Sequence, residues 1–425
     1  MEIGVFGYID NAVERVGTIT TLPTYEEQFS YAGSFLDKHA DAQLSLSLPL
    51  QEEPFVSRRT RPYFKNLLPE GAALRAIAKK FEVNSSAYLQ ILSRLGDECI
   101  GAVLISAEES ELEPSTPSYV EISRDEIAAF ARRESDGMAD LQVESKLSLA
   151  GAQSKMGVRI RESGGETRYF LPHGRAASSH IIKTANRRFE MLSENEHYCM
   201  KLAATCGIKT PHTFVDMVQK DVPLFVIERY DRTADESSGE VSRLHQEDFC
   251  QALGLLPEDK YEQPGRSYLR LVSELIARNS SRPAEDMRGL FTLMAFNVLI
   301  GNCDGHLKNI SFLCDESWSS RSLAPAYDLA STVIYGGLDR HFALRVGSTS
   351  KIDQMCRSDF EKAAEEARMS RKAVLAILDE TAEAVVTSSP DMIEELEDVL
   401  HKKLEKLHAI QQFSNQKALE LGSCS

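Results

Sequence analysis

Polar side chains that could act in phosphoryl transfer crowd one short stretch between two apolar segments, "NVLIGNCDGHLKNISFL". Asp304, His306, Lys308 and Asn309 lie within it, and a further acid, Asp328, follows in "APAYDLAST". Phosphoryl transfer from a nucleotide needs a carboxylate that accepts the proton of the attacking hydroxyl, and oxygen ligands for magnesium on the phosphates. In protein kinases an Asp, an Asn five positions later and a downstream Asp supply these groups. The same spacing here favours a kinase, although a pair of ordinary loop residues or a metal-dependent hydrolase also fits this stretch alone.

A second group of candidate residues lies upstream, in "SKLSLAGAQSKMGVRI". Ala150, Gly151, Ala152 and Gln153 precede an expected strand, and Lys155 follows closely. The backbone N–H groups of such small residues can cover the phosphates of a nucleotide. The pattern is not a G-x-G-x-x-G loop, so taken by itself it is explained more simply as an ordinary turn.

Two further segments come in the order that a kinase requires. "HIIKTA" places Lys183 in a buried strand, where an ammonium group needs an anion or a carboxylate such as Glu194 or, preferably, Glu196. The alternative for Lys183 is a solvent-exposed edge-strand lysine. "LFVIERYDR" is a buried strand that breaks at Glu228 to Asp231, like the segment between kinase lobes that pairs with adenine; a strand end with a Glu–Arg salt bridge is the alternative. Together, the four signals favour a kinase over their separate alternatives.

The surrounding pattern predicts an α+β protein with a two-lobed, protein-kinase-like fold preceded by a small α/β module. The module, residues 1–112, contains a predicted strand at "AQLSLSLPL" and predicted helices at "PEGAALRAIAKKF" and "SSAYLQILSRLG". The acidic segment "SAEESELEPSTPS" is interpreted as the linker to the next unit. Residues 113–235 are expected to form a β-rich lobe, with a hairpin at "GVRIRESGGETRYFLP" and a helix at "ENEHYCMKLAATCG". Residues 236–425 are expected to form a helical lobe.

Local signals predict where three helices begin. Ser123 and Glu126 have the spacing of a capping box, and Ser358 and Glu361 repeat it. The dipeptide Ser389-Pro390 offers an N-cap and a first-turn proline for the helix "DMIEELEDVLHKKLEKLHAIQQF".

Charge and cysteine content exclude several classes of protein. The formal net charge of −16 argues against a general nucleic-acid binder, because phosphate contacts need a basic surface. The eight cysteines include no C-x-x-C pair, so neither a zinc site nor a disulfide framework is expected. No signal peptide and no apolar run of membrane-spanning length is recognised. A cytoplasmic protein without membrane contact is predicted.

The chain resembles the HipA-type serine/threonine kinases, the toxins of bacterial HipBA toxin–antitoxin modules. The resemblance rests on "SLAGAQSKM", "HIIK", "ENEHYCMKLA", "VIERYDR", "RLHQEDFCQALG", "GNCDGHLKNISFL" and "LAPAYDLAST". "LSLSLPL", "FKNLLPEG" and "RLGDECIGAV" are similar to the module that this family carries ahead of its kinase core. The match spans nearly the whole chain in order.

The resemblance implies a role for each matching residue. It makes Asp304 the catalytic base, Asn309 and Asp328 the Mg²⁺ ligands, and Ser148 a site of autophosphorylation that shuts the enzyme down. A phosphate beside the nucleotide phosphates would repel them, which gives this switch a physical basis. The residues implied to contact ATP are Ala150, Gly151, Ala152, Gln153, Ser154, Lys155, Lys183, Glu228, Arg229, Tyr230, Asp231, His306, Leu307, Lys308, Asn309, Tyr327 and Asp328.

The same resemblance implies partners. A small HipB-like DNA-binding antitoxin is expected, with DNA contacted only through or beside it, and the substrate is expected to be a translation protein of the aminoacyl-tRNA synthetase class. Two alternatives stay open: a phosphatidylinositol or small-molecule kinase, and a non-catalytic co-repressor. Gly305 departs from the family, in which an acid often stands at that place. In the short motif Ser148-Leu149-Ala150, alanine stands at the third position, so Ser148 is the one serine of this motif that can be phosphorylated.

Overall fold

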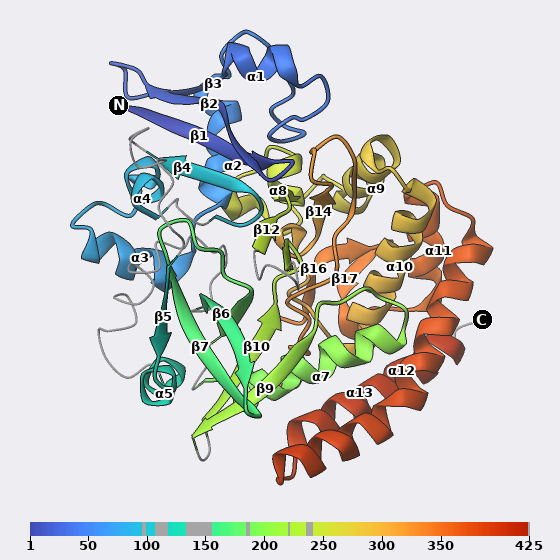
Figure 1. Ribbon diagram of the computed structural model, residues 1–425. Helices are drawn as coiled ribbons and strands as arrows, with labels where there is room; N and C mark the ends of the chain where they lie inside the picture. The colour runs from blue at the N-terminus through green and yellow to red at the C-terminus, as the bar shows by residue number, and fades with distance from the viewer. Residues whose placement is uncertain are drawn as a thin grey trace. The chain divides into compact units, whose positions relative to one another are not determined.

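The computed structural model describes residues 1–95, 99–106, 118–132, 155–183, 188–219, 222–234 and 241–423 (Figure 1). The chain forms two compact units, each built from stretches that are far apart in the sequence. The first unit consists of Met1–Thr184, Asp216–Pro257 and Phe312–Arg321. The second consists of Ala185–Val215, Glu258–Ser311 and Ser322–Ser425.

The N-terminal part of the first unit is an antiparallel sheet with helices on it (Figure 1). The strand order is β3-β2-β1-β4. Its elements are β1 (Glu2–Ile9), β2 (Ala12–Thr21), β3 (Glu27–Tyr31), α1 (Gly33–Lys38), α2 (Ser57–Asn66), α3 (Gly71–Lys80), α4 (Tyr88–Leu95) and β4 (Val103–Ser106). The predicted helices at residues 69–81 and 85–96 are thereby confirmed as α3 and α4.

The predicted strand "AQLSLSLPL" is wrong. Residues 42–50 form a loop in which Ser45 and Leu48 make only an isolated bridge. The alternation of leucine and serine instead reflects a loop that buries Leu44 and Leu48 in the core. Its Ser45 hydroxyl donates a 2.7 Å hydrogen bond to Glu247, which lies 202 residues further along the chain.

A tryptophan from a distant segment completes the core of this sheet. Trp318, the only tryptophan of the chain, is fully buried among the residues of β1, β2 and β4. Its ring stacks on His245 at 4.1 Å between centroids. Gly7 of β1 lies so close that a Cβ atom there would be 2.4 Å from the indole ring. A glycine is therefore required at this position, because the aromatic ring occupies the space of a side chain.

The second sheet of the first unit has the strand order β5-β7-β6-β8-β10-β9. The predicted hairpin is β6–β7, with Gly164 and Gly165 at its turn. The predicted capping box is also confirmed, because Ser123 N donates to Glu126 at 2.8 Å and Glu126 N donates to the Ser123 hydroxyl at 3.3 Å. The elements are β5 (Ser118–Ile122), α5 (Arg124–Arg132), β6 (Lys155–Ser163), β7 (Glu166–His173), β8 (His180–Lys183), β9 (Thr213–Gln219) and β10 (Val222–Glu228).

Short elements close the first unit. They are β11 (Arg232–Ala234), β12 (Val241–Arg243), β13 (Gln246–Asp248), α8 (Phe249–Ala252), the 3-10 turn η2 (Pro257–Asp259) and β14 (Ser311–Cys314). Asp248 caps α8 by accepting a hydrogen bond from Gln251 N, and the Gln251 side chain accepts one from Asp248 N.

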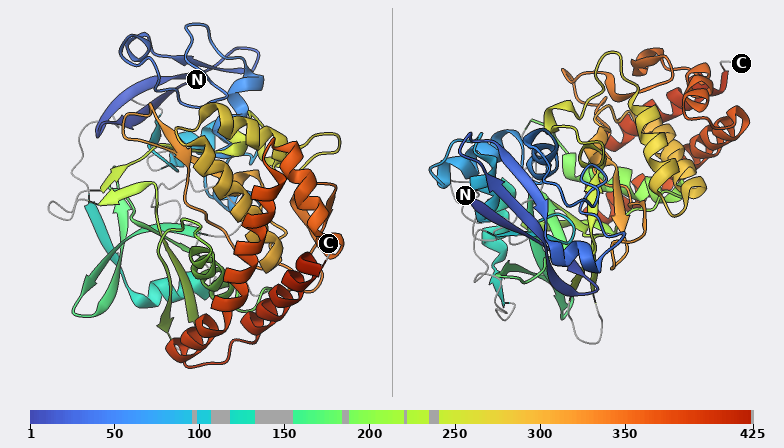
Figure 2. Two further views of the ribbon diagram at one scale, coloured as in Figure 1. Left: turned by 90° about the vertical axis from the view of Figure 1, so that its right-hand side faces the viewer. Right: turned by 90° about the horizontal axis from the view of Figure 1, so that it is seen from above.

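The second unit is mostly helical. Its long helix α10 packs against α9, α12 and α13, and α12 lies alongside α13 (Figure 2). The elements are α7 (Leu192–Thr205), α9 (Tyr268–Asn279), α10 (Pro283–Ile300), η3 (Leu307–Asn309), β15 (Arg321–Leu323), β16 (His341–Val346), β17 (Thr349–Lys351), η4 (Ile352–Gln354), α11 (Arg357–Glu366), α12 (Arg371–Leu400) and α13 (Glu405–Ser423). None of the helices in the described residues is both long enough and apolar enough to cross a membrane.

Two of the predicted helix starts are wrong. α11 begins one turn before Glu361, with Cys356 as its N-cap and Asp359 as the residue that completes the capping box. α12 runs through Pro390 and ends only at His401, which has a left-handed φ of 51°. The helix continues because Ser389 is buried against α7, where its hydroxyl bonds that of Tyr198 at 2.5 Å. Tertiary packing thus outweighs the local signal of a serine followed by a proline.

A buried glutamate joins three segments of the first unit. Glu247 accepts hydrogen bonds from the Ser45 hydroxyl and from Leu46 N, and it lies 3.4 Å from the Arg321 guanidinium. Burial raises the pKa of Glu247 to about 7, although Arg321 and the hydrogen bonds act in the opposite direction. The folded protein therefore retains this proton at a pH where the unfolded chain has released it.

We predict that Glu247 makes the protein less stable as the pH rises from about 4.5 to about 7. The folded-state pKa lies above the ordinary value of 4.5, so the contribution of this group to stability falls across that window. In Glu247→Gln, the loss of unfolding free energy between pH 5 and pH 7.5 should be smaller than in the wild type by about 2 kcal/mol. Urea unfolding at both pH values measures it, with the exposed Glu52→Gln as control. Equal pH dependence in all three proteins would contradict the assignment.

Candidate active site

The candidate catalytic loop begins where α10 ends. Gly301 follows the last helical residue with a left-handed φ of 70°. A Cβ atom at this position would lie 2.3 Å from Val333, so both the backbone conformation and the close packing require glycine. The chain therefore leaves the helix at a fixed angle.

Hydrogen bonds within the loop hold Asp304 and Asn309 at a fixed separation. The Asn309 side-chain amide donates to the Asp304 carbonyl oxygen at 3.1 Å, and His306 N donates to the same oxygen at 2.8 Å. Asn302 accepts from Asp304 N at 3.1 Å and donates to Asn297 of α10 at 3.0 Å. These hydrogen bonds connect Asn309 to Asp304 within the loop, and they connect the loop to α10, the helix that precedes it.

The Asp304 carboxylate is exposed, as a proton acceptor for a substrate hydroxyl must be. Tyr261 donates a hydrogen bond from its hydroxyl to Asp304 Oδ1 at 2.8 Å, and its ring meets His306 edge-on at 5.4 Å. No sequence signal pointed to Tyr261, because it lies 43 residues upstream of Asp304 in a loop without a motif. Its contact with Asp304 is visible only in the fold.

The structure explains Gly305, which the sequence left without an interpretation. A Cβ atom at this position would lie 2.9 Å from the side-chain nitrogen of Asn297. Because the Asn297 side chain holds Asn302, and Asn302 holds Asp304, a larger residue at 305 would disturb the contacts that position the candidate base.

The orientation of Asn309 suits a metal ligand. Its Nδ2 atom is used in the hydrogen bond to Asp304, which leaves the amide oxygen as the atom available to a cation. An amide oxygen and the carboxylate of Asp328 are hard donors of the kind that Mg²⁺ prefers. Among the described residues no cluster of three His, Cys, Asp or Glu side chains could hold a metal, so phosphate oxygens would have to complete the coordination.

The segment that carries Asp328 is fastened to the catalytic loop through Tyr327. The Tyr327 hydroxyl donates to the Lys308 carbonyl oxygen at 2.7 Å and bonds the Ser311 hydroxyl at 2.6 Å. Asp328 itself has a left-handed φ of 55°, an unfavourable conformation for a residue with a side chain. Such backbone strain is common at functional sites, where the surrounding contacts maintain it.

Helix α7 anchors the residues that follow Asp328. Asn195, fully buried, donates to the Ser331 carbonyl oxygen and accepts from Ser331 N, each at 2.9 Å. On the same helix Glu194, one of two proposed partners for Lys183, forms an ion pair with Lys402 at 2.5 Å. The preferred partner, Glu196, stays a prediction.

In the first unit, two candidate phosphate-binding lysines lie opposite each other. Lys183 of β8 is buried and pairs in register with Lys155 of β6, and its ammonium lies 5.4 Å from the Phe225 ring centroid. The predicted phosphate-covering residues 150–154 and Ser148 lie outside the described residues.

The predicted adenine-facing segment contains a buried ion-pair cluster. Asp231 lies 2.8 Å from Arg229 and 3.1 Å from Arg232, and accepts from Gly101 N at 2.7 Å. Although burial alone would raise it, the two guanidinium groups hold the pKa of Asp231 well below its usual range. The Asp231 carboxylate therefore connects residues of the first unit with one another. Its predicted position near a ribose stays a prediction. Glu228 is exposed at the end of β10, and the Tyr230 hydroxyl donates to Gln246.

An exposed aspartate, an asparagine whose side-chain nitrogen bonds the same loop and a downstream aspartate with a left-handed φ are residue types found in the sites of phosphotransferases. Comparison with known protein families identifies the family of the chain. Residues 147–389 match the family described as "HipA-like C-terminal domain", and residues 9–106 match the "HipA N-terminal domain". The chain belongs to the HipA family, and the resemblance predicted from its motifs is confirmed.

Similar proteins carry kinase names, in agreement with the predicted enzyme class. The chain is 36% identical over 370 residues to "Putative kinase Y4mE" of Sinorhizobium fredii, covering 84% of this chain and 85% of that protein. It is 27% identical to the "Serine/threonine-protein kinase toxin HipA" of Shewanella oneidensis, covering 71% and 70%. The solved complex of the Shewanella HipA with HipB and its operator DNA has the same fold, with a TM-score of 0.81 at 19% identity, covering 99% of this chain and 97% of that one.

We predict that Asn195→Ala destabilises the second unit. The substitution leaves the N–H and carbonyl groups of Ser331 buried without their partners, at a cost of about 2–5 kcal/mol. Urea unfolding measures the loss, and hydrogen exchange at the Ser331 amide should become faster. Asn279→Ala, which removes one half-buried hydrogen bond to Leu275, is the matched control and should cost less than about 1.5 kcal/mol. A similar cost for both variants would contradict this role of Asn195.

Proposed function

We propose that this chain is an ATP- and Mg²⁺-dependent serine/threonine protein kinase that acts as the toxin of a toxin–antitoxin pair. The observation that carries the proposal is the closed loop in which the Asn309 amide donates to the Asp304 carbonyl oxygen. This contact sets a candidate base and a candidate metal ligand at one fixed spacing. Membership of the HipA family and the kinase names of relatives support it.

Each candidate residue has a defined task in this mechanism. Asp304 accepts the proton of the substrate hydroxyl, while the Tyr261 hydroxyl keeps the carboxylate in place. Asn309 and Asp328 hold Mg²⁺, which when bound neutralises charge on the transferring phosphoryl group. Lys183 and Lys155 bind phosphate oxygens. The segment Glu228–Tyr230 faces adenine, and Asp231 orders that segment.

The domain boundaries follow from the same proposal. Residues 1–112 form the N-terminal module, residues 113–235 the β-rich lobe of a kinase fold and residues 236–425 its helical lobe. The Shewanella relative was solved with HipB and operator DNA, which supports an antitoxin as the partner of this chain and a contact with DNA through or beside that antitoxin. A translation protein of the aminoacyl-tRNA synthetase class is the proposed substrate, in the cytoplasm.

We predict that Asp304→Asn lowers phosphoryl transfer at least about 100-fold, because a general base contributes this much or more. The assay measures transfer of labelled phosphate from Mg-ATP to the chain itself and to lysate proteins. The exposed Asp398→Asn is the control and should keep wild-type activity. Asp304→Asn should keep the stabilisation by Mg-ATP in a thermal shift assay, because the proposed metal ligands are intact.

Three results would change the conclusion. Equal activity of Asp304→Asn and the wild type would contradict the catalytic assignment. Stabilisation by Mg-ATP without any transfer would indicate a non-catalytic co-repressor. Transfer only to phosphatidylinositol vesicles or to small molecules would indicate a kinase with a different substrate.

We predict that the chain inactivates itself by phosphorylating Ser148. After incubation with Mg-ATP, mass spectrometry should find phosphate on Ser148 of the wild type and none on Asp304→Asn. Ser148→Ala should keep its activity over the incubation in which the wild type loses most of it. Ser145→Ala, in the same stretch, is the control and should lose activity as the wild type does. Loss of activity at the same rate in Ser148→Ala would contradict this switch.

A further inference from the structure

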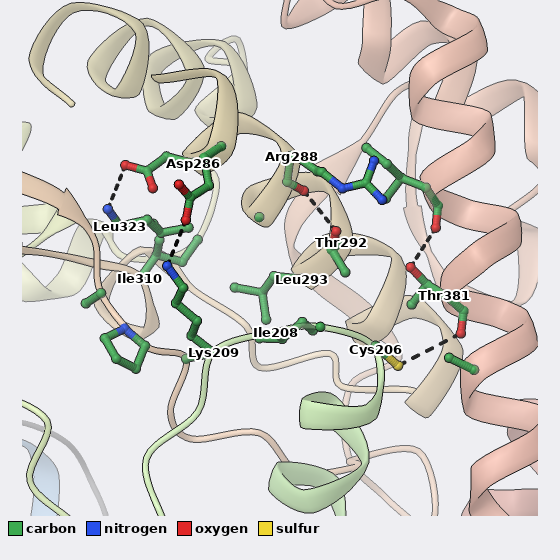
Figure 3. A pocket seen from close by; sticks show the side chains of 18 of the residues that line it. Cys206, Ile208, Lys209, Asp286, Arg288, Thr292, Leu293, Ile310, Leu323 and Thr381 are labelled. Atoms are coloured by element: carbon green, nitrogen blue, oxygen red, sulfur yellow. Dashed lines mark hydrogen bonds and ion pairs between the residues drawn. The ribbon is translucent and has the colours of Figure 1, made fainter. Parts of the chain in front are cut away.

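The second unit contains a cavity whose wall includes Asn309 but no other residue that the proposed mechanism uses. Its volume is about 350 Å³, within the range of small-molecule sites. Its walls come from the end of α7, the first half of α10, the middle of α12 and the segments around residues 310 and 324. Its apolar lining includes Ile208, Leu293, Ile310, Leu323, Pro325 and Ile377. Figure 3 shows the lining residues Ile208 and Leu293 between Lys209 on one side and Arg288 on the other.

A glycine on α10 keeps this cavity open. Gly289 lines the cavity and lies inside an 18-residue helix, where glycine costs about 0.5–1 kcal/mol relative to alanine. Neither backbone conformation nor crowding requires it: its φ is not positive, and the nearest atom to an added Cβ is Leu323 Cδ2 at 3.4 Å. The absence of a side chain at residue 289 leaves room in the cavity. Folding does not require glycine at this position, so the open space is the feature that accounts for it.

A buried carboxylate lines the same cavity. Asp286 is 4% exposed, and its Oδ2 atom accepts from Leu323 N at 2.8 Å and from the Ser280 hydroxyl at 2.5 Å. Within the described residues its Oδ1 atom accepts no hydrogen bond. A ligand that donates a hydrogen bond to this oxygen would make a charge-assisted contact with a largely buried carboxylate.

The charges around the cavity identify the ligand class. Lys209 pairs with Glu285 at 2.7 Å and Arg288 pairs with Glu380 at 2.5 Å, so both cations at the rim are already compensated. Asp286 is the remaining charge. We propose that the cavity binds a small amphipathic amine, whose ammonium group donates to Asp286 and whose apolar body lies against Leu293, Ile310 and Ile377.

The position of the cavity links this ligand to the catalytic loop. Asn309, Ile310 and Ser311 form part of its wall. Ser311 also bonds the Tyr327 hydroxyl, which holds the segment of Asp328. A bound amine therefore touches the chain directly after the candidate metal ligand. The binding itself does not depend on the proposed kinase activity.

Methyl NMR of the full chain, without nucleotide, tests the proposal with 2-phenylethylamine and its isosteric alcohol, 2-phenylethanol, as probes. At pH 7 the amine should shift the methyl signals of Ile208, Leu293, Ile310 and Ile377, and bind at least about tenfold more tightly than the alcohol, because a charged donor makes the stronger hydrogen bond. In Asp286→Asn this preference should disappear.

Two variants that fill the cavity from opposite walls complete the test. Gly289→Leu on α10 and Ala384→Leu on α12 should both abolish the shifts, while Gly289→Ala should keep a thermal midpoint no lower than that of the wild type. The proposal is overturned if the amine causes no shifts up to millimolar concentration, if the shifted methyls lie outside the cavity, if amine and alcohol bind equally, or if both filled variants still bind the amine.

Discussion

The hydrogen bond from the Asn309 side chain to the Asp304 carbonyl oxygen is the constraint on which the candidate site depends. It fixes the spacing of two residues whose functions require a defined geometry, and it uses the side-chain nitrogen of Asn309, which leaves the amide oxygen available to a cation. A loop without this contact would present a base and a metal ligand in many arrangements. Because a misplacement of about 1 Å costs much of the benefit of pre-positioning, the closed loop is the central structural feature of the proposed mechanism.

Buried polar groups extend this constraint beyond the loop. Asn297 and Asn302 tie its start to α10, Tyr327 ties its end to the segment of Asp328, and Asn195 of α7 fixes the residues after that. Each contact places a side-chain amide or hydroxyl against a backbone group or another polar side chain in a protected environment, where an unmade bond is expensive. Apart from the short 3-10 turn η3, these side-chain contacts hold the loop in place.

The first unit is held together by segments that meet only after folding. Trp318 packs against Gly7, and Glu247 joins Ser45 to Arg321. Neither contact has a sequence signal, because the partners are separated by roughly 70 to more than 300 residues. The same reason explains why the loop around Ser45 was predicted as a strand: its alternating leucines are buried by partners that come from distant segments.

Features that depend on neighbours in the chain can be predicted from the amino-acid sequence alone. The spacing of Asp304 and Asn309, the β6–β7 hairpin and the capping box at Ser123 all arise from contacts over a few residues, so residue types and spacing suffice to predict them. The tertiary structure alone decided that Tyr261 supports Asp304 and that α12 continues through Pro390. Burial against distant segments supplies more free energy than a local helix-start signal, and a sequence does not record which distant segments will meet.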